Sequence, residues 1–409
     1  MNQRMDRNRL NIGVYHLKPY ARTEAHVKNL ADCGVDFVVC MDYDRPALDL
    51  LHKYGVGAIV TGLVPGWWGG DGGNAGTMAE RNPMEKYYAS AAAFVDHPAI
   101  WGIDVGDEPS ALDFPYYGKI IDYVNRAFPN QFAYLNLYPN YASVSQNNAV
   151  ETVNQLGTPT YAEHIRRYCE CVPSDYLCYD FYLYSINEIL HYENLRVVAD
   201  ACRNTGRSMW IVLQVNSSDP KVWMSENNLR FQAYTAMAFG TENIIWACYT
   251  AGWWHNQVLD GAGNKTQQYD KLQKINAEIR TIGEEYMKYR RVATHFVGFG
   301  GYPDMHVVKQ EPIPSLSTGV FFDVKADNGA PLVIGEMVNR KADGSVALMV
   351  CAADDPFEKD PKEYRVTFRA PNRSVRALGG SGYKTVSDLG DGLYAVDIRS
   401  NEGVLITAR

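Results

Sequence analysis

The chain has 409 residues, of which 46% are hydrophobic and 21% are charged, and its formal net charge is -8. No apolar run reaches the roughly 18 residues that a membrane-spanning helix needs, and the acidic excess offers no clustered basic face for a phosphate backbone. We therefore expect a globular protein with no membrane span and no nucleic-acid partner.

Apolar runs of strand length alternate eight times with longer segments of helical period. The runs are nearly continuous, which is typical of parallel strands covered on both faces. The predicted strands are 10–15, 35–41, 56–64, 99–106, 132–138, 175–182, 208–215 and 243–249. The predicted helices are 24–34, 45–55, 84–97, 116–128, 161–172, 188–206, 227–240 and 269–290.

Eight β–α units in succession close most simply into a (β/α)8 barrel, a TIM barrel of the α/β class. A doubly wound open sheet is the alternative, but it usually has a glycine-rich turn after its first strand, and VYHLKPYAR is not one. After about residue 291, short alternating strands separated by Asn-Gly, Asp-Gly and Gly-Gly turns indicate an all-β, sandwich-like domain. We predict a barrel domain over 1–290 and a β-domain over 291–409.

In a barrel, the residues at the carboxyl ends of the strands converge on one mouth, where active sites are built. The fourth strand ends in GIDVGDEPS, so Asp107 and Glu108 stand where Pro109 stops further strand pairing. Adjacent carboxylates in a partly dry setting repel each other when both are ionised, so one is expected to keep its proton and act as a general acid. The alternative interpretation is that Asp107 caps the following helix and Glu108 is solvated.

The sixth strand ends in LCYDFYLY, and Asp180 is the predicted second carboxylate of the site. Its alternative role is that of a buried structural partner. Further contacts to a bound ring are expected from strand ends and from the loop 65–82. These candidate residues are His16, Asp42, Trp67, Trp68, Asn136, Tyr138, Tyr179, Tyr182, Gln214 and Trp246. For each aromatic residue among them, ordinary packing is the alternative.

Other chemistries find no support in the sequence. There is no HExxH, no paired CxxC and no G-x-S-x-G motif, and GWWGGDGGNAG is not followed by GK[ST], so we expect no metal and no cofactor. The eight cysteines have no framework spacing and are expected to be free thiols. The N-terminus has no apolar signal region, which leaves localisation open because a removed signal would leave the same sequence. The oligomeric state is not indicated.

The motif WGIDVGDEPS resembles the fourth-strand motif of barrel glycosidases, and LNLYPNYAS, SDYLCYDFYLY, SMWIVLQV and LRFQAYTAMAFGTENIIWACY resemble bacterial glycoside hydrolases related to clan A. The resemblance runs over most of residues 10–290. It implies an oligosaccharide or glycan substrate, with Glu108 as general acid/base and Asp107 as its substrate-contacting neighbour.

The chain departs from that pattern at the seventh strand, where the retaining enzymes of the clan have a nucleophilic Glu and this sequence has Gln214. Either Asp180 replaces the nucleophile or none is needed. The adjacent Asp-Glu pair also resembles substrate-assisted N-acetylhexosaminidases, which implies that Asp107 orients the acetamido group while Tyr179 or Tyr182 steadies it. Two rival functions are a non-catalytic carbohydrate-binding barrel and a lyase or isomerase that uses Asp107 and Asp180.

Overall fold

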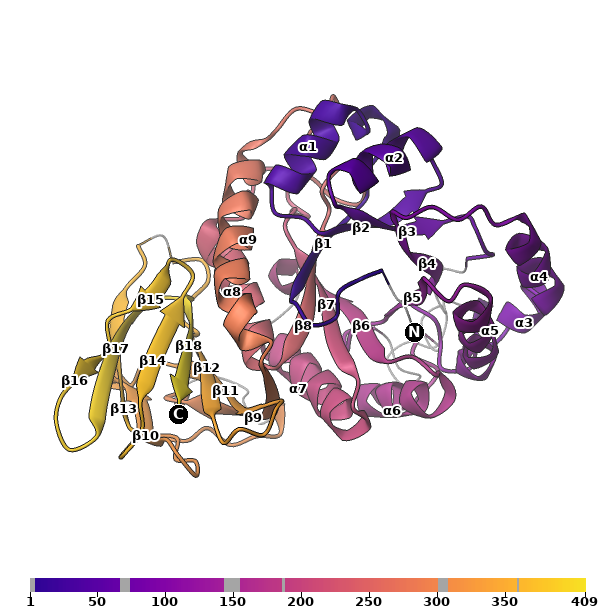
Figure 1. The fold of residues 1–409 in the computed structure, drawn as a ribbon. Helices are drawn as coiled ribbons and strands as arrows, with labels where there is room; N and C mark the ends of the chain where they lie inside the picture. Colours follow the sequence, from indigo (N-terminus) through magenta and orange to yellow (C-terminus); the bar gives the residue numbers. More distant parts are fainter. Residues whose placement is uncertain (1–3, 67–73, 143–154, 186–187, 301–307, 359) are drawn as a thin grey trace.

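The computed structural model describes residues 4–66, 74–142, 155–185, 188–300, 308–358 and 360–409. Eight parallel strands form a closed barrel in the order β1 to β8 (Figure 1), which confirms the predicted fold class. The strands are β1 (Asn11–Tyr15), β2 (Phe37–Asp42), β3 (Gly57–Thr61), β4 (Ile100–Asp107), β5 (Phe132–Leu137), β6 (Tyr176–Phe181), β7 (Ser208–Gln214) and β8 (Thr241–Ala247).

Helices surround the barrel on its outside (Figure 1). They are α1 (Glu24–Asp32), α2 (Arg45–Lys53), α3 (Met78–Arg81), α4 (Met84–Ala93), α5 (Phe114–Ala127), α6 (Tyr161–Cys171), α7 (Glu188–Thr205), α8 (Glu226–Ala238) and α9 (Gln267–Tyr286). Several begin at a side chain that accepts a hydrogen bond from the first turn, as Thr160 does for α6 and Ser225 for α8. Such caps satisfy backbone N–H groups that the helix itself leaves without partners.

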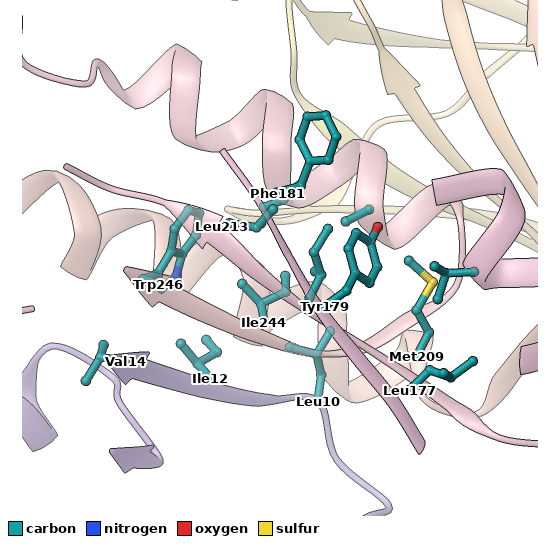
Figure 2. Packing of buried hydrophobic residues seen from close by; sticks show 14 of the residues in the cluster. Leu10, Ile12, Val14, Leu177, Tyr179, Phe181, Met209, Leu213, Ile244 and Trp246 are labelled. Atoms are coloured by element: carbon teal, nitrogen blue, oxygen red, sulfur yellow. The ribbon is translucent and has the colours of Figure 1, made fainter. Parts of the chain in front are cut away.

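Strand alternation divides the barrel core into two layers. One cluster contains strand residues such as Tyr176, Cys178 and Trp210 and no residue of a helix, so it fills the barrel interior. The other combines the alternate strand residues with helix residues, and Figure 2 shows Tyr179 and Trp246 within it. Because successive side chains of a strand point to opposite faces, this division decides which residues can reach the mouth.

Two antiparallel sheets form the C-terminal part. One has the order β15-β14-β18-β12-β11-β9 and the other has the order β10-β13-β17-β16. Their strands are β9 (Tyr289–Val297), β10 (Phe322–Ala326), β11 (Leu332–Asn339), β12 (Val346–Ala352), β13 (Glu363–Arg369), β14 (Val375–Gly379), β15 (Gly382–Lys384), β16 (Ser387–Asp388), β17 (Leu393–Arg399) and β18 (Gly403–Ala408). The sandwich-like β-domain is thus present, while its separation from the barrel at 290/291 stays a prediction.

The larger sheet is covered on both faces. Leu348 and Val350 of β12 belong to the core between the two sheets, whereas Ala347 and Met349 belong to the core shared with the barrel. The second face lies against α8 and α9 (Figure 1). This double burial explains why β12 reads as a continuous apolar run in an otherwise alternating domain.

Among the helices that the structure describes, none is long and apolar enough to cross a bilayer. Within the same residues, no group of three or more His, Cys, Asp or Glu side chains is arranged to hold a metal ion.

Candidate active site

Carboxylates from two strands meet at the carboxyl end of the barrel, around one amide group. Asn136, near the end of β5, donates from Nδ2 to Oδ1 of Asp107 at 3.1 Å and to Oδ1 of Asp180 at 2.7 Å. The two carboxylate oxygens therefore lie within two hydrogen-bond lengths of each other. The sequence-predicted residues Asp107, Asn136 and Asp180 thus form one cluster.

Glu108 joins this cluster because the backbone turns at its position. Its φ is +47°, in the left-handed region that non-glycine residues seldom adopt. Its N–H donates to the carbonyl of Asn136 at 2.9 Å, and its side chain hydrogen-bonds with Asp180. Regular strand geometry would send Asp107 and Glu108 to opposite faces. The left-handed turn instead lets both carboxyl groups reach the same cluster.

Burial sets the protonation of these groups. It raises the pKa of Asp180, the charge of Asp107 raises it further, and the hydrogen bonds with Asn136 and Glu108 lower it. Burial also raises the pKa of Asp107 against the lowering effect of Asn136. Two carboxyl groups can hydrogen-bond to each other only if one carries a proton, because an ionised carboxylate only accepts. A hydrogen bond between Glu108 and Asp180 therefore requires a proton on one of the two groups.

A further carboxylate, which was not among the predicted site residues, lies on β4 three residues before Asp107. Asp104 on β4 is buried and accepts hydrogen bonds from the Cys40 thiol at 3.2 Å and the Gly106 N–H at 3.0 Å. Burial and the charge of Asp107 raise the pKa of Asp104 to about 7. Its position three residues before Asp107 on the same strand was the available signal. The chain has a register shift between Asp104 and Gly106, which sequence alternation does not reveal.

Aromatic rings surround the same end of the barrel. Trp253, in the segment after β8, makes edge contacts with Tyr15, His16 and Tyr182 at centroid distances of 5.6, 5.7 and 5.8 Å. Tyr182 also contacts Trp254 at 4.9 Å. The structure thus brings the predicted residues His16 and Tyr182 together around a tryptophan that sequence reasoning missed. The signal was the pair of tryptophans in GWWHN, a few residues after the last barrel strand.

Two partly buried side chains complete this rim. Burial and the charge of Lys18 lower the pKa of His16, while the Cys40 carbonyl at 3.4 Å from Nδ1 raises it. The lowered pKa favours the neutral form of the His16 ring. Tyr141, which follows β5 and was not predicted, hydrogen-bonds with the backbone of Tyr182 and lies close enough to Asp180 and Glu108 to sense their charges.

Three predicted contact residues face away from the cluster, and these predictions are corrected. Tyr179 and Tyr138 are buried in the layer between barrel and helices, with Tyr138 against the ring of His164 on α6. Trp246 is fully buried in the same layer (Figure 2). Its Nε1 donates to Asn276 of α9 at 2.9 Å. Tyr179 and Trp246 have the outward parity of their strands, and Tyr138 follows the end of β5 and is buried against α6, so none of the three forms a wall of the mouth.

Two other residues predicted to contact the substrate have interaction partners within the protein. Gln214 is buried, accepts from the N–H of Tyr184 at 3.1 Å and donates to the carbonyl of Asn216 at 3.1 Å. The oxygen and the nitrogen of its amide are therefore both hydrogen-bonded to backbone groups of the segments that follow β6 and β7. This corrects the prediction that Gln214 binds sugar hydroxyls. Asp42 is exposed and forms an ion pair with Arg22, so the structure places it outside the carboxylate cluster. Trp67 and Trp68 lie outside the described residues.

No family model matches the chain, and no curated protein matches it. Among solved structures, a cycloisomaltooligosaccharide glucanotransferase of Paenibacillus sp. complexed with cycloisomaltoheptaose covers 98% of this chain and 85% of its own, with a TM-score of 0.57 and 8% identity. A glucosidase from Croceicoccus marinus covers 98% and 96%, with a TM-score of 0.45 and 10% identity. The catalytic module of a family 98 glycoside hydrolase from Streptococcus pneumoniae covers 100% of both chains, with a TM-score of 0.44 and 8% identity. The first likeness shows the shared fold.

Proposed function

We propose that this protein is a glycoside hydrolase that cleaves an oligosaccharide or glycan, with Glu108 as general acid/base. The observation that carries the proposal is the amide of Asn136, which holds Asp107 and Asp180 together beside Glu108. Two carboxyl groups, one protonated and one ionised, are what most glycoside hydrolases use. The glucanotransferase of the same fold, crystallised with a cyclic oligosaccharide, is consistent with a carbohydrate substrate.

The different exposure of Glu108 and Asp180 would give the two carboxyl groups different catalytic roles. Glu108 is partly exposed and Asp180 is buried, at 3% of its accessible surface. Glu108 would protonate the leaving oxygen, because it can approach a bound substrate and shares a proton with Asp180. Asp180 would then be the ionised partner that attacks the anomeric carbon or activates water.

The burial of Asp180 also favours a second version of the same reaction. Asp107 is more exposed than Asp180 and is likewise held by Asn136. In a substrate-assisted mechanism Asp107 would orient a 2-acetamido group of the substrate, which would attack the anomeric carbon in place of a protein nucleophile, and Tyr182 would steady it. Trp253 would supply the apolar face on which the sugar ring stacks in either version.

The decisive experiment compares Glu108→Gln with the unaltered protein on a panel of aryl and natural glycosides. Loss of the acid should lower kcat/KM by at least about 100-fold on natural glycosides. The loss should be smaller on substrates with a good leaving group, because these need less protonation. Glu363→Gln, on the exposed face of β13 with a side chain 73% exposed, is the matched control and should leave kcat/KM unchanged.

The same panel separates the mechanisms and the rivals. Asp180→Asn should abolish turnover if Asp180 is the partner, whereas turnover restricted to 2-acetamido sugars and lost in Asp107→Asn indicates substrate assistance. A chain that binds sugars but turns over none of them would be a carbohydrate-binding barrel. An unsaturated product would indicate a lyase. Full activity of Glu108→Gln on natural glycosides would refute the proposal.

A further inference from the structure

A cavity of about 360 Å³ lies at the end of the barrel opposite to the carboxylates. It is built from the start of β7, the residues between α8 and β8, the last turns of α7 and the start of β9. These are amino ends of barrel strands, whereas the carboxylate cluster is at carboxyl ends. The cavity is therefore separate from the candidate active site and lies where the barrel meets the larger β-sheet.

Arginine dominates this cavity. Among the described residues that line it are Arg7, Arg203, Arg207, Arg290, Arg291 and Arg340, against the two carboxylates Asp175 and Glu242. The chain as a whole carries a net charge of -8. Three of the six guanidinium groups are ion-paired, Arg7 with Asp175, Arg291 with Asp200 and Arg340 with Glu242, so the described residues leave an excess of positive charge here that costs electrostatic energy. A compensating anion would offset the cost.

The guanidinium groups retain unused hydrogen-bonding capacity. Arg207 donates to the carbonyls of Ser174 at 2.7 Å and Val172 at 2.9 Å, but its buried Nη1 has no partner within the described part of the chain. Arg7 pairs with Asp175 at 3.2 Å through Nη1, and its Nε and Nη2, which have no hydrogen-bond partner there, belong to a guanidinium group packed 5.2–5.6 Å from the ring centres of Phe132, Tyr176 and Trp210. The buried Nη1 of Arg207 is the donor that calls for a ligand, an ion or a water molecule, because such groups are uncommon in native proteins.

The cavity wall is also held firmly. Arg291 approaches the chain at Gly240, where an added Cβ would come 2.9 Å from the Cβ of Arg291, and its guanidinium lies 5.7 Å from the ring centre of Phe239. Both terminal nitrogens of Arg291 contact Asp200 at 3.1 Å. Burial lowers the pKa of the Arg291 guanidinium and the charge of Arg203 lowers it further, although Asp200 raises it. Asp200 therefore compensates the charge of Arg291, and the neighbouring Arg203 has no ion pair among the described residues.

We infer that this cavity binds a small phosphate-bearing anion. Guanidinium groups match the oxygens of phosphate in bidentate geometry, and the site uses arginine where a diffuse cationic surface would also contain lysine. Met209 and Phe239 lie behind the arginines in the lining, where both side chains are buried. The volume is that of a small-molecule site. Because Arg291 comes from β9 and Arg340 follows β11, the anion would fasten the β-domain to the barrel.

Titration calorimetry and thermal unfolding at constant ionic strength test this inference, with inorganic phosphate, a hexose 6-phosphate and neutral hexose as probes. We expect both phosphates to bind and to raise Tm by about 2 °C at tenfold excess over Kd, and the neutral hexose to do neither. Tighter binding of the hexose phosphate would identify a monoester as the ligand, and equal binding would identify free phosphate.

The matched variants are Arg203→Gln/Arg290→Gln, at exposed positions of the cavity, and Arg373→Gln/Arg399→Gln, at exposed positions of the β-domain outside it. Both remove two charges. The first should weaken phosphate binding at least about tenfold, and the second should leave it unchanged. Equal weakening in both variants, or no phosphate binding by the unaltered protein, would overturn the inference.

Discussion

Nδ2 of Asn136 lies 2.7 Å from Oδ1 of Asp180, in a hydrogen bond that crosses from β5 to β6 at the mouth of the barrel. The oxygen of the same amide accepts from the Cys178 thiol at 3.4 Å, which fixes the amide with its nitrogen toward the carboxylates. Asn136 thus stabilises the ionised forms of Asp107 and Asp180 in surroundings that otherwise favour their neutral forms.

Asn136→Ala should therefore raise the pKa of both aspartates. We expect kcat/KM to fall about 10- to 100-fold, because the variant loses the hydrogen bonds from the amide to both carboxylates. The acidic limb of the pH profile of kcat/KM should move to higher pH, because the aspartates of the variant ionise only at higher pH. Asn204→Ala, at an exposed position of α7, is the control. An unchanged pH profile in an active variant would show that Asn136 does not tune these groups.

Asp104 should make stability depend on pH. Its pKa is about 7 in the folded protein and ordinarily 3.8, so the folded state binds more protons between these values. The contribution of Asp104 to stability is therefore largest below about pH 4 and is lost as pH rises toward 7. Asp104→Asn, which carries no charge, should gain stability relative to the unaltered protein by a few kcal/mol between pH 5 and pH 8.

The measurement is the difference in the free energy of unfolding between Asp104→Asn and the unaltered protein at the two pH values. Asp122→Asn, on the exposed face of α5, should show no such change. The same difference at both pH values would mean that Asp104 is ionised throughout.

The positions of the catalytic candidates could be predicted because they depend on strand ends. Eight apolar runs located the barrel, and Asp107, Glu108 and Asp180 stand where those runs stop. The direction of each side chain was harder to predict. Tyr179 directly precedes Asp180 and must face the opposite way, so strand alternation alone excludes it.

Other features depend on contacts that no local pattern contains. Gln214 is occupied by the backbone of Tyr184 and Asn216, from segments that meet only in the folded barrel. The turn at Glu108 needs a left-handed residue that a Gly would have signalled, but here a Glu adopts it. Trp253 follows the last strand within a loop, where periodicity provides no direction.

Trp246 offers a direct test of its corrected position. Trp246→Phe removes the hydrogen bond to Asn276 and leaves that buried oxygen without its donor. We expect the free energy of unfolding to fall by about 1–3 kcal/mol, with KM and sugar binding unchanged. A wall of the sugar site would show the reverse, a raised KM at nearly unchanged stability. Thermal unfolding and steady-state kinetics on the same preparation distinguish the two results.

Gly335 tests how firmly the β-domain is joined to the barrel. It lies on β11 against α8, where an added Cβ would come 2.3 Å from the carbonyl oxygen of Ala238. Gly335→Ala must therefore push the sheet away from α8, and overpacking of this kind costs about 1–3 kcal/mol. Gly319→Ala, where nothing lies within 4 Å of the added atom, is the matched control.

The expected result is a lower Tm for Gly335→Ala, with little change for Gly319→Ala. Because β11 and β12 share a core with the barrel helices, the whole chain should still unfold in one transition. If calorimetry instead resolves a separate early transition in Gly335→Ala, the sheet contributes little to the barrel. An unchanged Tm would mean that β11 does not approach α8 closely in solution.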